Sequence, residues 1–343
     1  MDPEKEPTIY DVARVANVSI ATVSRVFNKS NLVAESTVRH VLNIAEKLNF
    51  TPSASARGLS GGKQETIGIV LPVLYGNFFS DLIYSMQAPA EARGYDIVVA
   101  GQKGSPDELF GTLRKMSSKV DGLILMYHKE GLMEEITRRC PRMPVVLLSR
   151  FVRFREHVDL VLDNFTGARL ATEHLISMGH SKIAHIEGEA GNIDAIERTE
   201  GFLHSTGAAG IPRENIELLK GTFRQISGYN AAKELFERRR DITAIFSSND
   251  AMALGALNWM HQNGVNVPNE VAMCGFDDIE FAQMVRPSLS SVYLNTQKFG
   301  ETAFNILMKR IEEKSFPDVP SGLVIEPGLS VRESSSLKRS AKN

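Results

Sequence analysis

The feature that most constrains this chain is a regular alternation of short β-branched segments with amphipathic helical segments, which begins at Thr66 and runs for about 275 residues. This alternation predicts βαβ units, that is, parallel sheets covered by helices on both faces. One compact sheet cannot hold so many units, so we expect an α/β body of two doubly wound lobes. The clearest predicted strands are 66–72, 96–100, 120–126, 144–149, 159–163, 182–188, 243–248 and 271–277, and the clearest helices are 79–93 and 107–118.

The chain is expected to pass three times between the two lobes. The predicted crossings lie near 162–165, near 290–296 and near 321–326. The predicted divisions are a head of residues 1–51, a hinge helix and linker of 52–62, an N-terminal lobe of 63–163 with 293–322, a C-terminal lobe of 164–292 with 323–335, and a disordered tail of 336–343.

The head is predicted to contain three short helices. Thr8 and Asp11 have the spacing of a capping box at the first helix, and Ser19 can cap a second helix that runs to about Phe27. A third helix is expected from about 35 to 49. Between Thr8 and Ser60 the sequence has six Lys and Arg against three acids, although the whole chain carries a net charge of −2. A basic head on an acidic body favours a polyanionic partner.

The core residues of the second helix leave Ile20, Ala21 and Arg25 on the face that does not pack. A tight turn between the first two helices is typical of a helix-turn-helix, which places the start of its second helix in the major groove of DNA. Ile20 and Ala21 can then contact thymine methyl groups, and Arg25 can bind guanine through two hydrogen bonds. Thr22, Ser24 and Tyr10 are placed for phosphate contacts. The alternative is a small helical oligomerisation domain in which Arg25 is simply solvated.

The segment that follows the head can form a helix that begins near Pro52 and ends at Gly61 and Gly62. A helix of this length is only marginally stable alone, so we expect it to need a partner that holds it.

The stretches TIYDVARVANVSIATVSRVFN and VAESTVRHVLNIAEKLNFTPSASARGLS resemble the head and hinge of the lactose-repressor (LacI/GalR) family of bacterial transcription regulators. The resemblance extends over nearly all of the body to about Glu333, and implies a two-lobed body like that of periplasmic binding proteins. It implies that Ile20, Ala21 and Arg25 read bases, and that the hinge folds on the operator with Leu59 wedged into the minor groove. For Leu59 the alternative is a linker residue that touches the body. The full set expected to contact DNA is Tyr10, Ser19, Ile20, Ala21, Thr22, Ser24, Arg25, Asn28, Ser53, Ala56, Arg57 and Leu59.

One head of this size makes few base contacts, so two heads on a two-fold dimer are expected to read a palindromic operator in double-stranded DNA. The family resemblance implies the same homodimer, formed through the body. We expect effector binding to rotate the lobes and so change operator affinity.

Polar and aromatic residues follow the carboxyl ends of several predicted strands, where doubly wound sheets bind ligands. The resemblance matches its effector-contacting Arg, Asp, Asn and aromatic residue to Arg198, Asp277, Asn249 and Phe223. For three of these positions simpler alternatives exist: a solvated helix residue for Arg198, a core residue for Phe223, and helix capping for Asn249. We favour capping for the adjacent Asp250. The full set expected to bind the effector is Phe78, Phe79, Tyr127, Arg150, Asn192, Asp194, Arg198, Phe223, Asn249 and Asp277.

The expected effector is a sugar or a sugar derivative, and no cofactor or metal is expected. Phe78 and Phe79 resemble family members that bind purines, but Asn192 and Asp194 replace the Arg and Thr of the purine site. Arg150 resembles the sugar-responsive members. A nucleobase or another metabolite remains the alternative.

Other classes of protein are not favoured. The chain has no apolar run long enough to span a bilayer and no signal-peptide pattern, so we expect a cytoplasmic protein without membrane contact. Cys140 and Cys274 are expected to be buried free thiols. No dinucleotide, phosphate-loop or catalytic motif is present, which argues against an enzyme. A periplasmic sugar-binding protein would share the body but not the helix-turn-helix.

Overall fold

The computed structural model of the chain describes residues 7–27, 32–50, 63–72, 74, 76–102, 106–126, 138, 143–148, 158–313 and 323–336. Several predicted features therefore lie outside the described residues. They are the hinge helix and linker 52–62, the tail from 337 onward, Asn28, Ser53, Ala56, Arg57, Leu59, Tyr127, Cys140 and Arg150.

The head forms the three predicted helices, α1 (Ile9–Ala16), α2 (Ile20–Phe27) and α3 (Glu35–Lys47). Asp11 accepts hydrogen bonds from the Thr8 backbone N–H at 3.0 Å and from its hydroxyl at 2.7 Å, so the capping box forms as predicted. Asn17 adopts a left-handed φ of 53°, which turns the chain sharply between α1 and α2. The three helices share one small core, made of Val12, Ala13, Ala16, Val23, Val26, Val41 and Ala45.

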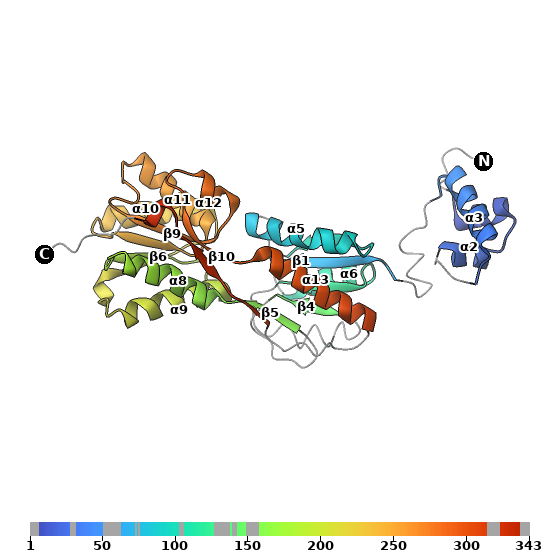
Figure 1. Cartoon of the computed structure of the whole chain (residues 1–343), viewed down its shortest axis with the longest axis horizontal. Coiled ribbons are helices and arrows are strands. Elements are labelled where there is room, and N and C mark those ends of the chain that lie inside the picture. The colour runs from blue at the N-terminus through green and yellow to red at the C-terminus, as the bar shows by residue number, and fades with distance from the viewer. Residues whose placement is uncertain are drawn as a thin grey trace.

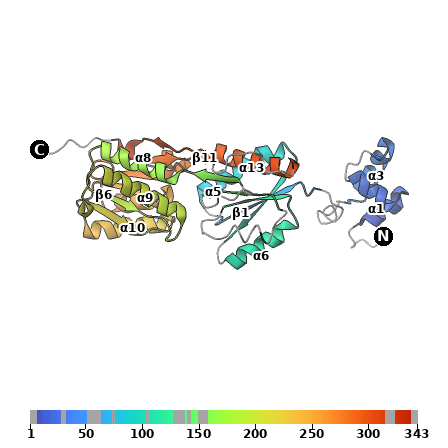
Figure 2. The same ribbon diagram turned by 90° about the horizontal axis from the view of Figure 1, so that it is seen from below.

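The N-terminal lobe is a six-stranded parallel sheet of order β11-β5-β4-β3-β1-β2. Its strands are β1 (Thr66–Leu71), β2 (Asp96–Gly101), β3 (Gly122–Leu125), β4 (Val145–Leu147), β5 (Val158–Leu162) and β11 (Leu323–Ile325). Alternate residues of β1 enter different cores: Ile69 packs with α5 (Asn77–Glu91) and α13 (Thr296–Glu313), whereas Val70 packs with α6 (Pro106–Ser117). These helices lie on opposite faces of the sheet (Figure 2).

The C-terminal lobe repeats this architecture with the sheet order β12-β10-β9-β8-β6-β7 (Figure 1). Its strands are β6 (Ile183–Ile186), β7 (Ile216–Leu219), β8 (Ala244–Ser247), β9 (Ala272–Asp277), β10 (Ser290–Tyr293) and β12 (Gly328–Ser330). Its helices are α8 (Asn164–Ser177), α9 (Ile193–Ala208), α10 (Gln225–Arg238), α11 (Asp250–Gln262) and α12 (Glu280–Met284), with short 3₁₀ turns at Arg213–Asn215 and Glu333–Ser335. The predicted α/β fold class of a three-helix head and two doubly wound lobes is confirmed. Among the described strands, β12 departs from parallel pairing because it runs antiparallel to β10.

Two predicted lobe boundaries need correction. Residues 323–325 were expected in the C-terminal lobe, but they form β11, which pairs with β5 in the N-terminal sheet. The chain therefore returns to the C-terminal lobe between Ile325 and Gly328. Tyr293, expected in the N-terminal lobe, pairs with Asp277 in the C-terminal sheet. A strand of three residues carries too little pattern to show which of two sheets it joins.

Among the described residues, no helix combines the length and the apolar character that a membrane span requires.

Candidate DNA-reading head and effector site

The second helix of the head divides its side chains between core and solvent as its sequence predicts. Val23 and Val26 are buried against α1 and α3, whereas Ile20, Ala21 and Arg25 are exposed. The Ser19 hydroxyl accepts a hydrogen bond from the Thr22 backbone N–H at 3.0 Å, which caps the start of the helix.

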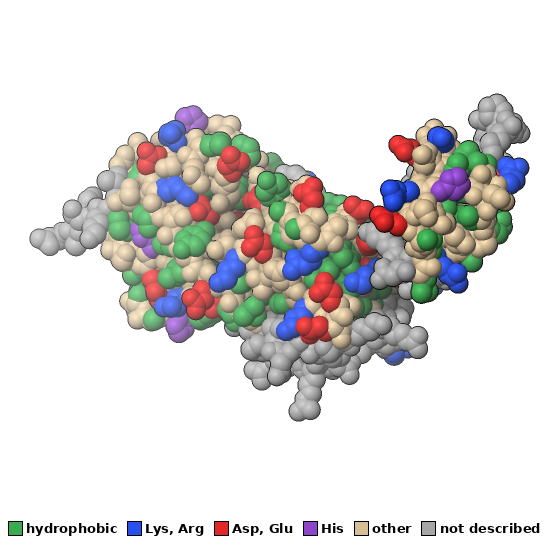
Figure 3. All heavy atoms as spheres, turned by 45° about the vertical axis from the view of Figure 1, so that its right-hand side comes forward, with side chains coloured by type: hydrophobic (Ala, Val, Ile, Leu, Met, Phe, Trp, Pro, Cys, Tyr) green, Lys and Arg blue, Asp and Glu red, His purple; other side chains and the backbone are tan. Residues whose placement is uncertain are grey.

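The other described candidates on the head are accessible too. Tyr10 on α1 and Ser19 are exposed, and Thr22 and Ser24 are half-buried. Lys and Arg side chains are spread around the surface of the head (Figure 3). An exposed Ile beside an Arg on a capped helix is an arrangement that can contact base edges in a groove.

In the C-terminal lobe, the centre of the candidate effector site is Arg198 on α9, a residue that is 5% exposed. Its Nε donates to the side-chain oxygen of Asn164 at 2.9 Å, and its Nη1 donates to the Ser248 carbonyl. Its guanidinium carbon lies 3.7 Å from the centroid of the Phe276 ring. Its Nη1 also lies 3.6 Å from Oδ1 of Asp277. Arg198 is therefore held in one orientation, which contradicts the alternative that it is a solvated helix residue.

Asp277 ends β9 in an uncommon backbone conformation. Its φ is 102° and that of Asp278 is 53°, so two successive non-glycine residues adopt positive φ at the carboxyl end of the strand. Burial raises the pKa of Asp277 to about 7, although the nearby Arg198 guanidinium favours the ionised form. Asp278 is paired with Arg332 at 2.6 Å. Of the two carboxylates, Asp277 is the one that faces Arg198.

Asn249 and Phe223 are joined by a hydrogen bond. The Asn249 side chain caps α11 by accepting from the Met252 N–H at 3.0 Å, and its amide donates to the Phe223 carbonyl at 3.0 Å. Capping is thus one function of Asn249. Asp250, for which we expected capping, instead lies fully buried and accepts from the Ser291 hydroxyl at 2.6 Å and from the Ile279 N–H at 2.9 Å. Asp250 therefore ties α11 to β10 and to the start of α12.

The remaining predicted residues of the C-terminal lobe lie around Arg198. The half-buried Phe223 ring packs against Gly188, where an added methyl group would overlap it, and the Arg198 guanidinium lies 5.8 Å from the ring centroid. Asn192 caps α9 by accepting from the Asp194 N–H at 2.9 Å, and Oδ1 of Asp194 accepts from the Asn164 amide at 3.1 Å. Asn164 therefore connects two of the predicted residues, Asp194 and Arg198.

In the N-terminal lobe, Phe78 and Phe79 lie in the first turn of α5 and pack against the core of the lobe. Both rings are half-buried, with centroids 5.3 Å apart and an interplanar angle of 79°.

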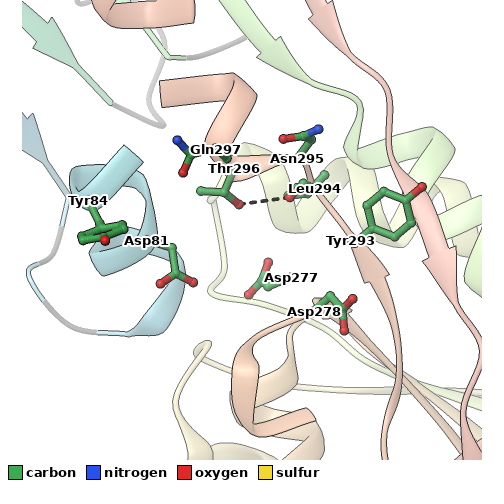
Figure 4. Close-up of a pocket in the computed structure, with 9 residues that line it drawn as sticks. All are labelled: Asp81, Tyr84, Asp277, Asp278, Tyr293, Leu294, Asn295, Thr296 and Gln297. Carbon is green, nitrogen blue, oxygen red and sulfur yellow. Dashed lines mark hydrogen bonds between the residues drawn. The ribbon is translucent and has the colours of Figure 1, made fainter. Parts of the chain in front are cut away.

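A cavity of about 350 Å³ lies between α5 and the end of β9, a volume within the usual range of small-molecule sites. Figure 4 shows Asp81 of the N-terminal lobe and Asp277 of the C-terminal lobe on opposite sides of it. Burial and the nearby Glu280 raise the pKa of Asp81. The cavity is lined by Asp81, Tyr84, Asp277, Asp278, Tyr293, Leu294, Asn295, Thr296 and Gln297.

Comparison with known families identifies both parts of the chain. Residues 8–53 match the family described as bacterial regulatory proteins of the lacI family. Residues 64–328 match the family of periplasmic binding proteins and the sugar-binding domain of the LacI family. The chain belongs to the LacI family.

Relatives of this LacI-family chain are named as transcriptional repressors. The HTH-type transcriptional repressor PurR of Histophilus somni (strain 129Pt) is 32% identical over 312 residues, which cover 90% of this chain and 93% of the relative. The repressor of the same name from Vibrio atlanticus (strain LGP32) is 33% identical over 312 residues, covering 90% and 92%.

Solved structures extend the likeness to the whole molecule. A lac repressor dimer bound to operator and the anti-inducer ONPF is 25% identical, with a TM-score of 0.84, and the match covers 96% of this chain and 99% of that chain. A complex of the transcriptional regulator CelR with cellobiose is 29% identical, with a TM-score of 0.70 and the same coverage. The protein is thus a DNA-binding LacI-family repressor and not an enzyme, and repressors of this family bind operator DNA as dimers and respond to small-molecule effectors.

Of the nine residues that line the cavity, the predicted effector set contains Asp277 alone. Sequence reasoning also missed Asn164 and Phe276, which contact Arg198. Asn164 follows the carboxyl end of β5, so the rule that selected the other residues could have selected it as well. Phe276 lies inside a strand, and Asp81 lies one turn into a helix. For neither residue does the local sequence indicate that the side chain contacts the site.

Proposed function

We propose that this repressor is controlled by a sugar or an uncharged sugar derivative that binds between the two lobes. The observation that carries the proposal is the pair of buried Arg198 and half-buried Asp277 at the edge of the C-terminal sheet, where Asp277 lines the cavity. A hydroxyl group both donates and accepts hydrogen bonds, so adjacent hydroxyls of a sugar can satisfy a carboxylate and a guanidinium together.

The charges around the pair favour an uncharged ligand. Asp81, Asp194 and Asp277 bring three carboxylates to this region, and Arg198 is the cation that contacts Asp277 among the described residues. When they are ionised, these carboxylates repel a phosphate group, whereas a hydroxyl group can hydrogen-bond to a carboxyl group in either protonation state. The aromatic rings of Phe78 and Phe223 provide apolar surface for the face of a sugar ring.

A nucleobase is the second candidate, because relatives at 32% identity carry the name PurR. The rings of Phe78, Phe79 and Phe223 could stack on a base, and Asp277 could accept from its ring N–H. Against this candidate, Asn192 and Asp194 stand where the purine-binding members of the family carry Arg and Thr.

A thermal-shift screen separates these candidates. Purified protein is heated with neutral mono- and disaccharides, with sugar phosphates and with purine bases, each at millimolar concentration. A ligand present at 100 times its Kd stabilises the native state by about 2.7 kcal/mol, so a true effector raises the melting temperature by several degrees. We expect a neutral sugar to do so, and Arg198→Ala to abolish the shift. A shift with purine bases alone supports the second candidate, and a shift with sugar phosphates alone contradicts the uncharged ligand.

We also propose that the body dimerises through the face on which α5 and α12 lie. Tyr84 on α5 is 72% exposed, and Phe281 and Met284 on α12 are 52% and 59% exposed. These are large apolar side chains to leave in water, and the cavity lined by Tyr84 and Asp278 places the two helices close together. The dimer would present two heads to a palindromic operator on DNA in the bacterial cytoplasm.

A further inference from the structure

The chain enters the N-terminal lobe at Gln64 and Glu65, directly after the segment that joins the head to the body. The backbone N–H of Gln64 donates to Oδ1 of Asp121 at 2.8 Å, and that of Glu65 donates to Oδ2 at 2.9 Å. One carboxylate, 56 residues further along the chain, thus holds two successive N–H groups with its two oxygens. Hydrogen bonds to an ionised acceptor are stronger than those between neutral groups.

The same two residues are held from other directions. The Glu65 carbonyl accepts from the Asp96 N–H at 2.8 Å, and the Thr66 hydroxyl donates to the Gln64 carbonyl at 3.0 Å. The Asp121 N–H donates to the Thr66 carbonyl at 2.8 Å. Glu65 itself adopts a left-handed φ of 50°, a conformation that a non-glycine residue keeps only when its surroundings impose it. The direction in which the chain leaves the lobe toward the head is therefore fixed.

Asp121 also lies beside the helix that leaves the crossing between the lobes. Gly122 follows Asp121 at the start of β3 and packs closely on α13. A methyl group added at Gly122 would lie 2.8 Å from Cδ1 of Leu307 and 3.1 Å from Cδ1 of Ile311. Helix α13 begins at Thr296, just after the second crossing, and runs along the lobe to its head-facing end (Figure 1).

We propose that Asp121 is a positioning residue for operator binding: its carboxylate anchors Gln64 and Glu65, where the chain enters the N-terminal lobe, so that this lobe sets the placement of the DNA head. The anchor rests on the proposed dimeric, operator-binding function. Two heads bind a palindrome tightly only if the second head stays close to its half-site once the first head has bound. The second head then has a high local concentration at that half-site. A loose exit from the lobe spreads the second head over more positions and lowers that concentration, while the phosphate contacts of each head stay the same.

The test compares operator binding by full-length Asp121→Ala, Asp121→Asn and the unaltered protein. The probe is a palindromic duplex selected from a random pool by the unaltered protein, and a scrambled duplex measures non-specific binding. The matched control is Asp96→Ala, which removes an exposed carboxylate from the adjacent strand β2 but leaves the Asp96 backbone N–H that holds Glu65.

We expect Asp121→Ala to lose about tenfold in affinity for the palindrome, with the binding-competent fraction of each preparation determined by titration. Asp121→Asn keeps one acceptor oxygen, so its affinity for the palindrome is expected to lie between that of Asp121→Ala and that of the unaltered protein. Affinity for the scrambled duplex and the slope of log affinity against log salt should not change, because each head keeps its phosphate contacts. A residue that only stabilises the fold would lower the melting temperature and the binding-competent fraction without this selective loss.

The proposal is overturned if both Asp121 variants bind the palindrome as tightly as Asp96→Ala, or if they lose equal affinity for both duplexes. Should Asp121→Ala fail to fold, the isosteric Asp121→Asn carries the same comparison. If the unaltered protein selects no palindrome, it is the proposed dimeric operator binding that fails, and the result is distinguishable from failure of the anchor.

Discussion

The side chains of α2 are divided between the core of the head and an exposed face that is available to a ligand. The helical period of 3.6 places Val23 and Val26 on the face toward α1 and α3, and leaves Ile20, Ala21 and Arg25 on the other face. Because this division follows from spacing alone, the sequence predicted which side chains are exposed. The prediction that this exposed face reads bases concerns Ile20, Ala21 and Arg25.

Replacing Arg25 by Ala should remove about 1–3 kcal/mol of preference for operator over random DNA, the usual value of a bidentate contact with guanine. Arg39 on α3 is also exposed, so Arg39→Ala is the matched control for the loss of one positive charge. Competition binding with operator and random duplexes measures the ratio of the two affinities. An unchanged ratio for Arg25→Ala would show that this residue does not read bases.

The buried carboxylate of Asp277 predicts a pH dependence. Because burial raises its pKa to about 7, the folded state favours the protonated form. Its contribution to stability is therefore full below its unfolded pKa and is lost as pH rises through about 7. Asp277→Asn cannot ionise, so its melting temperature should fall less between pH 5 and pH 8 than that of the unaltered protein, whatever its absolute value. Parallel pH profiles for the two proteins would contradict a raised pKa.

The site itself was only partly predictable. Arg198, Asp277 and Phe223 were selected because they follow the carboxyl ends of predicted strands and match the effector-contacting residues of the family, and their contact with an effector stays a prediction. The way in which Arg198 is held could not be found, because it depends on Asn164, which lies 34 residues earlier, and on the carbonyl of Ser248, 50 residues later. Such contacts depend on how whole elements pack, and no local pattern records them.

At the level of elements, the strands and helices follow the alternating pattern closely, because buried parallel strands need continuous β-branched runs. Helix α5 begins two residues before its predicted start at Phe79, and the assignment of β11 was wrong for the reason given above. The packing of helix pairs depends on glycines that the pattern did not mark. In α11, a methyl group added at Gly255 would overlap the Gln225 carbonyl oxygen of α10.

Gly255→Ala should therefore destabilise the C-terminal lobe by about 1–3 kcal/mol, since α10 and α11 would have to move apart. The control is Gly207→Ala in α9, where no atom lies within 4 Å of the added methyl group. That substitution should be neutral or stabilise by about 0.5–1 kcal/mol. Urea unfolding measures the free energy of unfolding of both variants. A loss of stability of similar size in both variants would contradict the close packing of α10 on α11.

At the scale of the whole molecule, two similar lobes are joined by three crossings of the chain, and we expect effector binding to rotate the lobes about these crossings. The exposed apolar side chains on α5 and α12 belong to different lobes, so a dimer formed through both would respond to any rotation between the lobes. This link between ligand, lobe angle and dimer geometry is the arrangement expected of a regulated repressor.

Replacing Met284 by Asp places a charge on the proposed dimer face and should shift the protein toward monomer at micromolar concentration. Leu203→Asp on α9 is the control, because Leu203 is also an exposed apolar residue but lies on the pair of helices α8 and α9 instead of α12. Sedimentation equilibrium measures the monomer–dimer equilibrium of both variants. A dimer as tight with Met284→Asp as with Leu203→Asp would place the interface elsewhere.

The most direct test of the account is a pair of titrations with a sugar found in the thermal-shift screen. One measures operator affinity with and without that sugar, and the other measures sugar affinity with and without operator. Because coupling between two binding sites is reciprocal, we expect both affinities to change by the same factor, about 5- to 150-fold. Arg198→Ala should bind operator and show no response to the sugar. If saturating sugar leaves operator affinity unchanged, the claim that a ligand in the body controls the DNA-reading head is wrong.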